Sequence, residues 1–243
     1  MKAIVLAAGR GSRLKGLTEN LPKTLVPFNR RPLLEHTLQS LREGGAGEIG
    51  IVGGYRRELL ARYTDTLFVN DEWEASGIFH SLSRASSWLE NETCLISYSD
   101  IFYPSELVAD VIAADGDIVV AYDPNAVALW QRRFSDALAD LERFQLDERR
   151  HIRIIGGQPL TLQEVQGQYM GLIRVTPKGW RELLRQQRSV ADPVLRMNVD
   201  MTSLLQQTLE AGTSLCAIPT KGPWGEIDCP SDIDVYQTLY PHL

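Results

Sequence analysis

The stretch AIVLAAGRGSRLKGLTENLPKTLVPF, residues 3–28, begins with an apolar run and continues into a basic loop that contains glycine. Residues 3–6 lack the alternation of a half-exposed strand, which predicts a strand buried on both faces. Gly9 and Gly11 follow, and glycine lets a backbone approach a ligand closely and present successive N–H groups to an anion. Because open parallel sheets bind ligands at the carboxyl ends of their strands, we expect a binding site in this loop.

The alternation of apolar run and helical pattern continues through the first half of the chain. Such alternation builds a mainly parallel sheet with helices on both faces, so the predicted fold class is α/β, with a Rossmann-like mixed sheet. Ser76 is placed to cap one of the helices. The predicted strands are 49–52, 66–69, 94–96 and 118–121, and the predicted helices are 32–43, 57–63, 77–89 and 104–113.

The pattern changes after residue 122. Residues 151–157 and 164–175 predict strands of an antiparallel insertion, which we expect to pack on the same sheet. Because no repeat or linker interrupts the chain, we expect one domain over residues 1–243. The remaining predicted elements are helices at 177–187 and 199–211, a strand at 214–218, and a last helix that begins at Pro230.

Composition excludes several classes of protein. The formal net charge is −6 and the pI is about 5.3, which argues against nucleic-acid binding because phosphate-tracking surfaces need clustered Lys and Arg. The three cysteines lack metal-ligand spacing and fit a reducing compartment. No apolar run approaches the roughly 20 residues of a membrane span, and residues 1–8 do not resemble a signal peptide. We therefore expect a cytoplasmic protein without a membrane partner.

Two basic residues of the loop can hold phosphate. Arg13 can form paired hydrogen bonds to a phosphate, and Lys23, which follows Pro22, can add a positive charge. The loop lacks both G-x-G-x-x-G and G-K-[ST], so neither a dinucleotide-binding motif nor a P-loop is supported.

Two acidic residues stand at the ends of other predicted strands. Asp100 follows the strand that begins at Cys94, and Asp228 ends the segment WGEID. If both strands run parallel to the first one, both carboxylates reach the edge where the glycine loop lies. Two carboxylates beside a phosphate site suit Mg²⁺. A structural alternative for Asp228 is the cap of the helix that begins at Pro230.

Five segments in order, LAAGRGSRL, PKTLVPF, RPLLEHTLQSL, YSDIF and WGEID, carry a family resemblance. Together they are similar to the sugar-nucleotidyltransferase superfamily, whose pattern is L-A-A-G-x-G-x-R-L followed by P-K. The resemblance is strong through residues 1–55 and loose between 123 and 215. It implies the nucleotidyltransferase fold, with a nucleotide-binding half over residues 1–122 and an acceptor-binding half over residues 123–243.

The resemblance also implies a reaction and roles for individual residues. A phosphate of the acceptor attacks the α-phosphorus of a nucleoside triphosphate and pyrophosphate leaves, with Mg²⁺ as cofactor. Arg13 then holds the β and γ phosphates, Lys23 bridges the α-phosphate and the acceptor, and Asp100 and Asp228 bind the metal ion. The residues expected to line the nucleotide are Leu6, Ala7, Ala8, Gly9, Gly11, Gly53, Ser81 and Asp100.

The acceptor is less clearly indicated. The chain lacks the Glu-Lys-Pro segment of enzymes that act on hexose 1-phosphates. The segments FVND at 68–71 and FHSL at 79–82 are instead similar to the branch that activates phosphocholine and 2-aminoethylphosphonate with CTP. A cationic head group would require aromatic faces and a carboxylate. The candidates are Tyr169, Trp224 and Asp200, with Trp73 as a further aromatic residue; burial in the core, or helix capping for Asp200, is the structural alternative.

Two other readings remain open. One is a guanylyl- or uridylyltransferase for a sugar 1-phosphate, and the other is a nucleotide-binding regulator without catalysis. The presence of Lys23, Asp100 and Asp228 favours an enzyme over a regulator. His80 is interpreted as a residue of a helix surface, and the sequence leaves the oligomeric state open.

Overall fold

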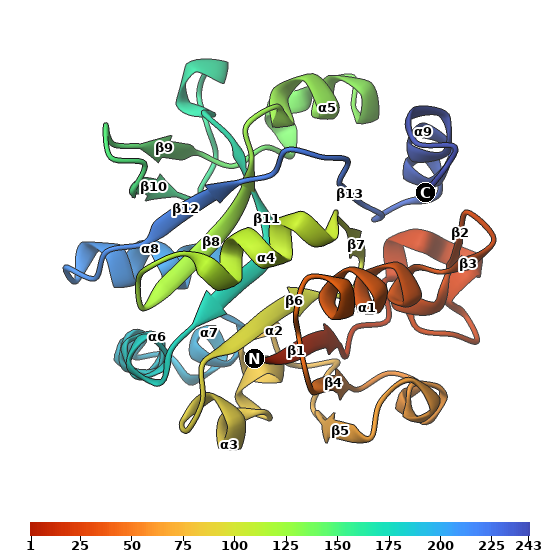
Figure 1. The fold of residues 1–243 in the computed structure, drawn as a ribbon, viewed down its shortest axis with the longest axis horizontal. Coiled ribbons are helices and arrows are strands. Elements are labelled where there is room, and N and C mark those ends of the chain that lie inside the picture. Colours follow the sequence, from red (N-terminus) through yellow and green to blue (C-terminus); the bar gives the residue numbers. More distant parts are fainter.

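The computed structural model describes residues 1–243 and is built on a seven-stranded sheet. Its strands are β1 (Lys2–Ala7), β4 (Ile49–Gly53), β5 (Thr66–Val69), β6 (Cys94–Tyr98), β8 (Ile118–Asp123), β11 (Gln168–Val175) and β12 (Cys216–Pro219). They lie in the order β12-β8-β11-β6-β1-β4-β5, as Figure 1 shows. Only β11 runs antiparallel to its neighbours. The prediction of a mixed, mainly parallel α/β sheet is confirmed.

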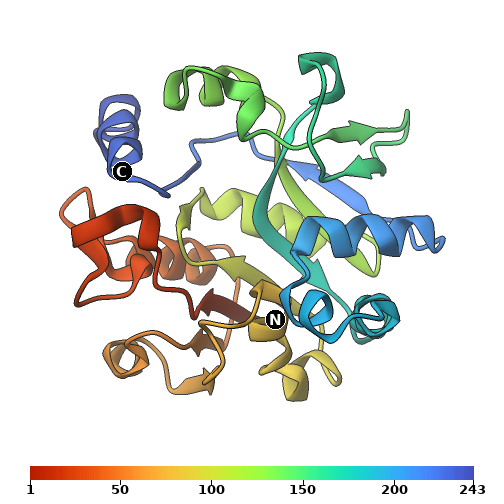
Figure 2. The ribbon, with the colours of Figure 1, turned by 180° about the vertical axis from the view of Figure 1, so that it is seen from behind.

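Helices cover both faces of this sheet. α1 (Leu33–Glu43) and α4 (Ser105–Ala113) lie on the face seen in Figure 1, and α2 (Ile78–Ser83), α6 (Pro177–Ser189) and α8 (Met201–Glu210) lie on the face seen in Figure 2. Residues 3–7 of β1 are all apolar and buried, because successive side chains point to opposite faces and both faces are covered. Val5 joins the core with α1 and α4, whereas Ile4 joins the core with α2, α6 and α8. Each face therefore has its own apolar core.

Shorter elements surround the sheet. The remaining helices are α3 (Ser86–Leu89), α5 (Ala126–Arg133), α7 (Pro193–Asn198) and α9 (Pro230–Leu239). Three small antiparallel pairs join β2 (Pro27–Phe28) to β3 (Arg31–Pro32), β7 (Ile101–Phe102) to β13 (Gly225–Glu226), and β9 (Phe144–Leu146) to β10 (Ile152–Ile155). The 3-10 segments are Ser12–Thr18, which is kinked at Lys15, and the single turns Lys23–Leu25, Arg57–Leu59, Ala61–Tyr63, Ala137–Ala139 and Leu162–Glu164.

Several local predictions were wrong. The segment 57–63 forms two 3-10 turns instead of the predicted helix. The hydroxyl of Ser76 donates to the Glu72 carbonyl in the preceding loop, and Gly77 stands at the helix cap instead. Helices α5 and α7 were not predicted. In contrast, the predicted antiparallel strand at 164–175 is confirmed: it is β11, which lies inside the central sheet between β8 and β6.

The carboxyl ends of β1, β4 and β6 meet at one edge of the sheet. Leu6 pairs with Tyr98 and Ala7 pairs with Gly53, so the glycine loop and Asp100 leave the sheet side by side. The convergence of Asp100 and Asp228 was expected on the condition that the segment before Asp228 runs parallel to β1. In the structure this segment does not run parallel to β1. It forms β13, which pairs antiparallel with β7 outside the central sheet. Asp228 therefore reaches this edge by a different route from the predicted one.

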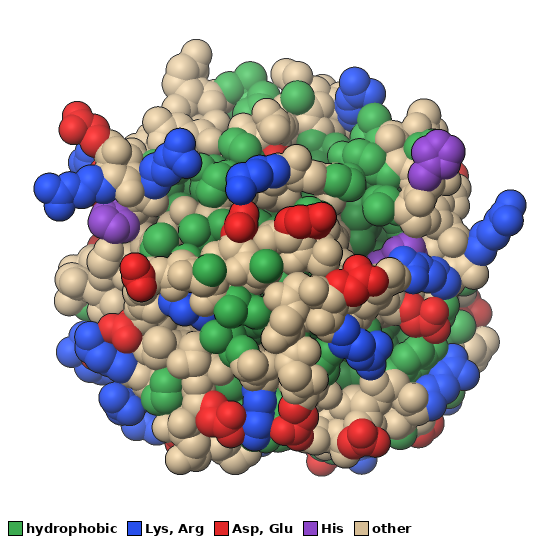
Figure 3. All heavy atoms as spheres, in the orientation of Figure 1, with side chains coloured by type: hydrophobic (Ala, Val, Ile, Leu, Met, Phe, Trp, Pro, Cys, Tyr) green, Lys and Arg blue, Asp and Glu red, His purple; other side chains and the backbone are tan.

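The surface is chemically mixed. On the face shown in Figure 3, positive and negative side chains are interspersed with apolar ones. None of the helices combines the length and the apolar character that a membrane crossing requires.

Candidate active site

The glycine loop is shaped around Lys23. Gly11 adopts a positive φ of 74°, and a Cβ atom at this position would meet the Lys23 side chain at 2.5 Å. Only glycine fits such a close approach in the left-handed region. Pro22 has an extended backbone and starts the 3-10 turn that carries Lys23. Gly11 is therefore required for close packing against Lys23, and not only as part of the sequence motif.

The Lys23 ammonium group joins the two predicted metal ligands. Its Nζ atom donates to Oδ2 of Asp100 at 2.7 Å and also to Oδ1 of Asp228. Nη2 of Arg13 donates to the same Asp228 oxygen at 2.8 Å. Burial alone would lower the pKa of Lys23, but Asp100 and Asp228 outweigh burial and raise that pKa. Four predicted residues from three distant segments thus form one charged cluster.

Glu226 completes this cluster, although the sequence analysis did not assign it a role. Carboxylate oxygens of Asp100, Glu226 and Asp228 all lie within 4.8 Å of one another. The backbone N–H of Ile227 donates to the Asp100 carbonyl at 2.9 Å, which holds the segment beside Asp100. Burial, together with repulsion from Asp228 and Asp100, raises the pKa of Glu226 well above its usual value. The signal available in the sequence was the Glu-x-Asp spacing, which puts both side chains on one side of an extended segment.

Arg133 supports the cluster from behind and was also missed. Its guanidinium group pairs with Asp232 at 3.0 Å and lies 4.0 Å from Asp228 Oδ2. Asp232 in turn accepts the backbone N–H of Asp228 at 2.8 Å. Burial would raise the pKa of Asp228, but Lys23, Arg13 and Arg133 outweigh burial and lower it. The network therefore holds the Asp228 carboxylate in position and in its ionised form.

The carboxylate cluster has the donor set of a magnesium site. Three hard carboxylate oxygens are the ligands that Mg²⁺ prefers, and phosphates and water complete its coordination. Oδ1 of Asp100 is buried and has no hydrogen-bond partner, so it can accept a metal ion without losing another interaction. The residues present fit a divalent cation.

A small cavity of about 130 Å³ lies beside Ala8 and Gly9 of the glycine loop. Four of the predicted nucleotide-binding residues line it, and Trp73 contributes to it rather than to the acceptor side. Ala7 and Gly53 do not line this cavity; the Gly53 carbonyl accepts the Asn70 backbone N–H at 2.9 Å. The lining residues are Leu6, Ala8, Gly9, Trp73, Ser76, Gly77, Ile78 and Ser81.

A larger cavity of about 410 Å³ opens beside the charged cluster, and Arg13, Glu226 and Asp228 form part of its wall. Tyr169 and Asp200 also line it, and Asp200 accepts the Ser203 backbone N–H, so Asp200 caps α8 as well. The structure places these two residues, predicted to bind the acceptor, in the wall of the same cavity as Arg13 and Asp228. Other lining residues that the sequence analysis did not predict include Trp130, Asp140, Glu142 and Gln168.

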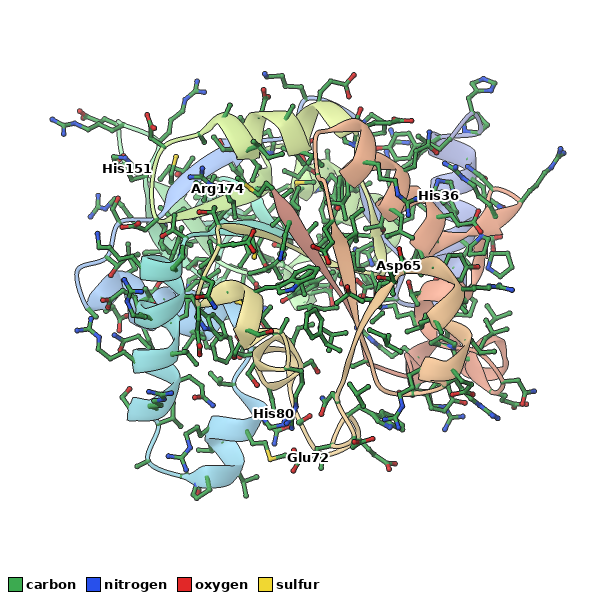
Figure 4. The ribbon with its side chains drawn as sticks, turned by 60° about the horizontal axis from the view of Figure 1, so that its bottom comes forward. His36, Asp65, Glu72, His80, His151 and Arg174 are labelled. Carbon is green, nitrogen blue, oxygen red and sulfur yellow. The ribbon has the colours of Figure 1, made fainter.

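Two other side chains lie away from this cavity. Trp224 is 2% exposed and packs behind Trp130, with ring centroids 5.9 Å apart. His80 lies beside Glu72 at the outer edge of the molecule, as Figure 4 shows, with Nε2 3.0 Å from a Glu72 carboxylate oxygen. Trp224 therefore does not line the cavity but packs against Trp130, which does.

Known proteins resemble this chain over different lengths. The chain is 29% identical to the CTP:phosphoglutamine cytidylyltransferase of Campylobacter jejuni subsp. jejuni serotype O:2, over 97% of this chain and 98% of that protein. It is 42% identical to the choline-phosphate cytidylyltransferase of Streptococcus pneumoniae, over 37% of this chain and 42% of that protein. Among solved structures, the inositol-1-phosphate CTP transferase from T. maritima has a TM-score of 0.74 at 18% identity, over 100% of this chain and 97% of that chain.

The family model gives the clearest assignment. Residues 3–164 match the MobA-like NTP transferase domain, a range that includes the glycine loop, Lys23 and Asp100. The chain belongs to the MobA-like NTP transferase family and is a nucleotidyltransferase.

Proposed function

We propose that the protein transfers CMP from CTP to a small phosphorylated or phosphonylated acceptor and releases pyrophosphate. The observation that carries this proposal is the position of Lys23 between Asp100 and Asp228, beside a cavity large enough for a small acceptor. CTP is favoured over other nucleotides because a relative that matches over 97% of this chain is a cytidylyltransferase. The small cavity beside the glycine loop, lined by Ala8, Gly9 and Ser81, is the proposed place of the nucleotide.

The proposed cofactor is Mg²⁺. Asp100 and Asp228 would hold it, with Glu226 as an additional ligand, because their oxygen atoms converge. A bound Mg²⁺ would neutralise negative charge on the phosphates during transfer.

In the proposed reaction an oxygen of the acceptor phosphate forms a bond to the α-phosphorus of CTP. The bond from that phosphorus to the oxygen bridging the α and β phosphates breaks, and pyrophosphate leaves with its electron pair. An acceptor phosphate is already an anion, so the chain needs no general base and acts by positioning and by charge. Arg13 would hold the β and γ phosphates, and Lys23 would bring the α-phosphate and the acceptor together.

The acceptor would occupy the larger cavity. Tyr169 and Asp200 line this cavity, which supports their proposed contact with the acceptor, whereas Trp224 would act indirectly through Trp130. Phosphocholine and 2-aminoethylphosphonate are the acceptors that the sequence suggested. The full-length relative adds a phosphorylated glutamine to this group.

Pyrophosphate release tests the proposal. The protein would be incubated with Mg²⁺, each of CTP, UTP, GTP and ATP, and a panel of acceptors that includes phosphocholine, phosphoethanolamine, 2-aminoethylphosphonate, glutamine phosphate and hexose 1-phosphates. We expect release with CTP and at least one of the amino-alcohol, aminophosphonate or glutamine acceptors. Turnover of hexose 1-phosphates with UTP or GTP, and none with these acceptors, would instead support a sugar-1-phosphate nucleotidyltransferase.

A further inference from the structure

The larger cavity carries a second set of carboxylates that no cation of the protein neutralises. Asp140, Glu142 and Asp200 line it, and none of them forms a salt bridge. Arg13 is the only basic side chain in the lining, and it pairs with Asp228. Unlike the cluster around Asp228, these three carboxylates do not all lie within 4.8 Å of one another. The cavity therefore holds negative charge that a ligand can neutralise.

Neutral donors fix these carboxylates in place. The Thr202 hydroxyl lies 2.9 Å from Glu142 Oε1 and 3.1 Å from Asp200 Oδ1. One hydroxyl hydrogen can serve only one of these two oxygens at a time. Asp200 also accepts the Ser203 backbone N–H at 2.7 Å and the Ser203 hydroxyl at 2.8 Å, whereas the Glu142 carboxylate accepts from Thr202 alone. The indole N–H of Trp130 donates to Asp140 at 2.8 Å. The carboxylates are thus preorganised, and Glu142 and Asp140 each have a single side-chain donor.

An independent observation in the same cavity also points to a polar ligand. Tyr169 is 8% exposed, lines the cavity, and its buried hydroxyl has no hydrogen-bond partner. A buried hydroxyl without a partner is costly unless a ligand or water satisfies it.

The aromatic rings of the cavity are poorly placed to surround a methylated cation. Trp130 is 1% exposed, and Arg133 already lies over its ring at 4.6 Å. Tyr98 and Tyr169 pack edge to face against each other, with centroids 5.7 Å apart. A quaternary ammonium group has no N–H and depends on open aromatic faces. The wall offers oxygen acceptors instead.

We propose that the end of the acceptor remote from its phosphate carries a protonated primary amine, which donates hydrogen bonds to Glu142 and Asp200 and satisfies the Tyr169 hydroxyl. This inference rests on the proposed function, because it assigns the larger cavity to the acceptor. It favours acceptors such as phosphoethanolamine, 2-aminoethylphosphonate or a phosphorylated amino acid derivative over phosphocholine.

Calorimetric titration with phosphoethanolamine and phosphocholine tests the inference, because the two differ only in three N-methyl groups. The full chain would be titrated with each ligand, both without nucleotide and with Mg²⁺ and a non-hydrolysable CTP analogue. We expect phosphoethanolamine to bind with a Kd about tenfold lower or better, since it alone can donate hydrogen bonds to charged acceptors. Equal or tighter binding of phosphocholine, or binding of neither ligand, would overturn the inference.

Variants locate the amine within the cavity. The double variant Glu142→Gln/Asp200→Asn should lose most of the preference for phosphoethanolamine, and Tyr169→Phe should lose part of it. Glu210→Gln is the matched control, because Glu210 lies on α8 but does not line the cavity. The preference is a ratio measured within each variant, so a change in the folded fraction does not alter it. An unchanged ratio in both variants would overturn the inference.

Failure of this inference differs from failure of the proposed function. If the enzyme releases pyrophosphate from CTP and prefers phosphocholine, the proposed function stands and the inferred amine is wrong. If phosphoethanolamine binds preferentially but no acceptor supports pyrophosphate release, the amine site stands and the proposed function is wrong.

Discussion

The Lys23 ammonium group donates a hydrogen bond to the Asp100 carboxylate across 2.7 Å, although 77 residues separate the two in the chain. Lys23 comes from the loop after β1, and Asp100 comes from the end of β6, the strand next to β1. Their contact follows from the parallel pairing of these strands, which brings their carboxyl ends together.

Lys23→Ala should reduce kcat by about 10²–10³-fold, because it removes a preorganised charge from the proposed transition state. It should also lower the thermal midpoint, since Asp100 and Asp228 lose their shared partner. Pyrophosphate release under saturating substrates measures the first effect. Lys221→Ala is the control, because Lys221 is exposed and pairs only with Asp110 on the surface. Near-normal kcat in Lys23→Ala would contradict the role assigned to Lys23.

Asp228→Asn and Glu226→Gln should each raise the Mg²⁺ concentration needed for half-maximal activity by about tenfold or more, because each variant removes a charged ligand from the cluster. Titration of pyrophosphate release with Mg²⁺ measures this shift. Asp234→Asn, a change on the helix that follows the cluster, serves as the control. Unchanged Mg²⁺ dependence in both ligand variants would exclude the proposed metal site.

Arg133→Met should lower the free energy of unfolding by about 3–5 kcal/mol, because it leaves the buried Asp232 carboxylate without its cation. The Arg133 side chain is fully buried, so solvent cannot replace the lost charge. The double variant Arg133→Met/Asp232→Asn should regain part of this loss. Urea denaturation of the wild type, both single variants and the double variant gives the coupling. If the losses in the two single variants simply add in the double variant, the ion pair contributes nothing to the free energy of unfolding.

Gly11→Ala should reduce activity about tenfold or more, because the new Cβ would displace Lys23 and the backbone would be strained at positive φ. Gly16→Ala, in the same loop, is the matched control, since a Cβ there meets no atom within 4 Å. We expect Gly16→Ala to keep its activity. Equal kinetics for the two variants would show that the close approach at Gly11 does not matter.

Asp117 should make the free energy of unfolding slightly dependent on pH. Hydrogen bonds from Lys178 and Thr176 lower the pKa of Asp117. Because the pKa of Asp117 is lower in the folded state than in the unfolded state, its contribution to stability is complete above the unfolded pKa of about 3.9. This contribution is lost as the pH falls through the folded pKa. Asp117→Asn should therefore lose up to about 1 kcal/mol near pH 6 and little near pH 2, because the pair is partly exposed. Urea denaturation at the two pH values checks the difference.

The sequence by itself determined the parts of the protein that depend on local pattern. The apolar run before Gly9 predicted β1, and the alternation with helical patterns predicted a mainly parallel sheet. Arg13, Lys23, Asp100 and Asp228 were recognised from their motifs, and they lie together in the structure. Backbone conformation and motif spacing are properties of neighbouring residues, so they can be predicted from the sequence without knowledge of the tertiary structure.

Only the tertiary structure decided which distant segments meet. It placed β11 between β8 and β6, and it brought the segment before Asp228 to the edge of the sheet by way of β13. It also revealed Glu226 and Arg133 beside Asp228 and gathered Glu142 and Asp200 around one hydroxyl. These contacts join residues far apart in the chain, and their free energy depends on burial and on charges supplied by other elements. No local pattern carries that information, which is why the larger cavity and its lining residues emerged only from the folded chain.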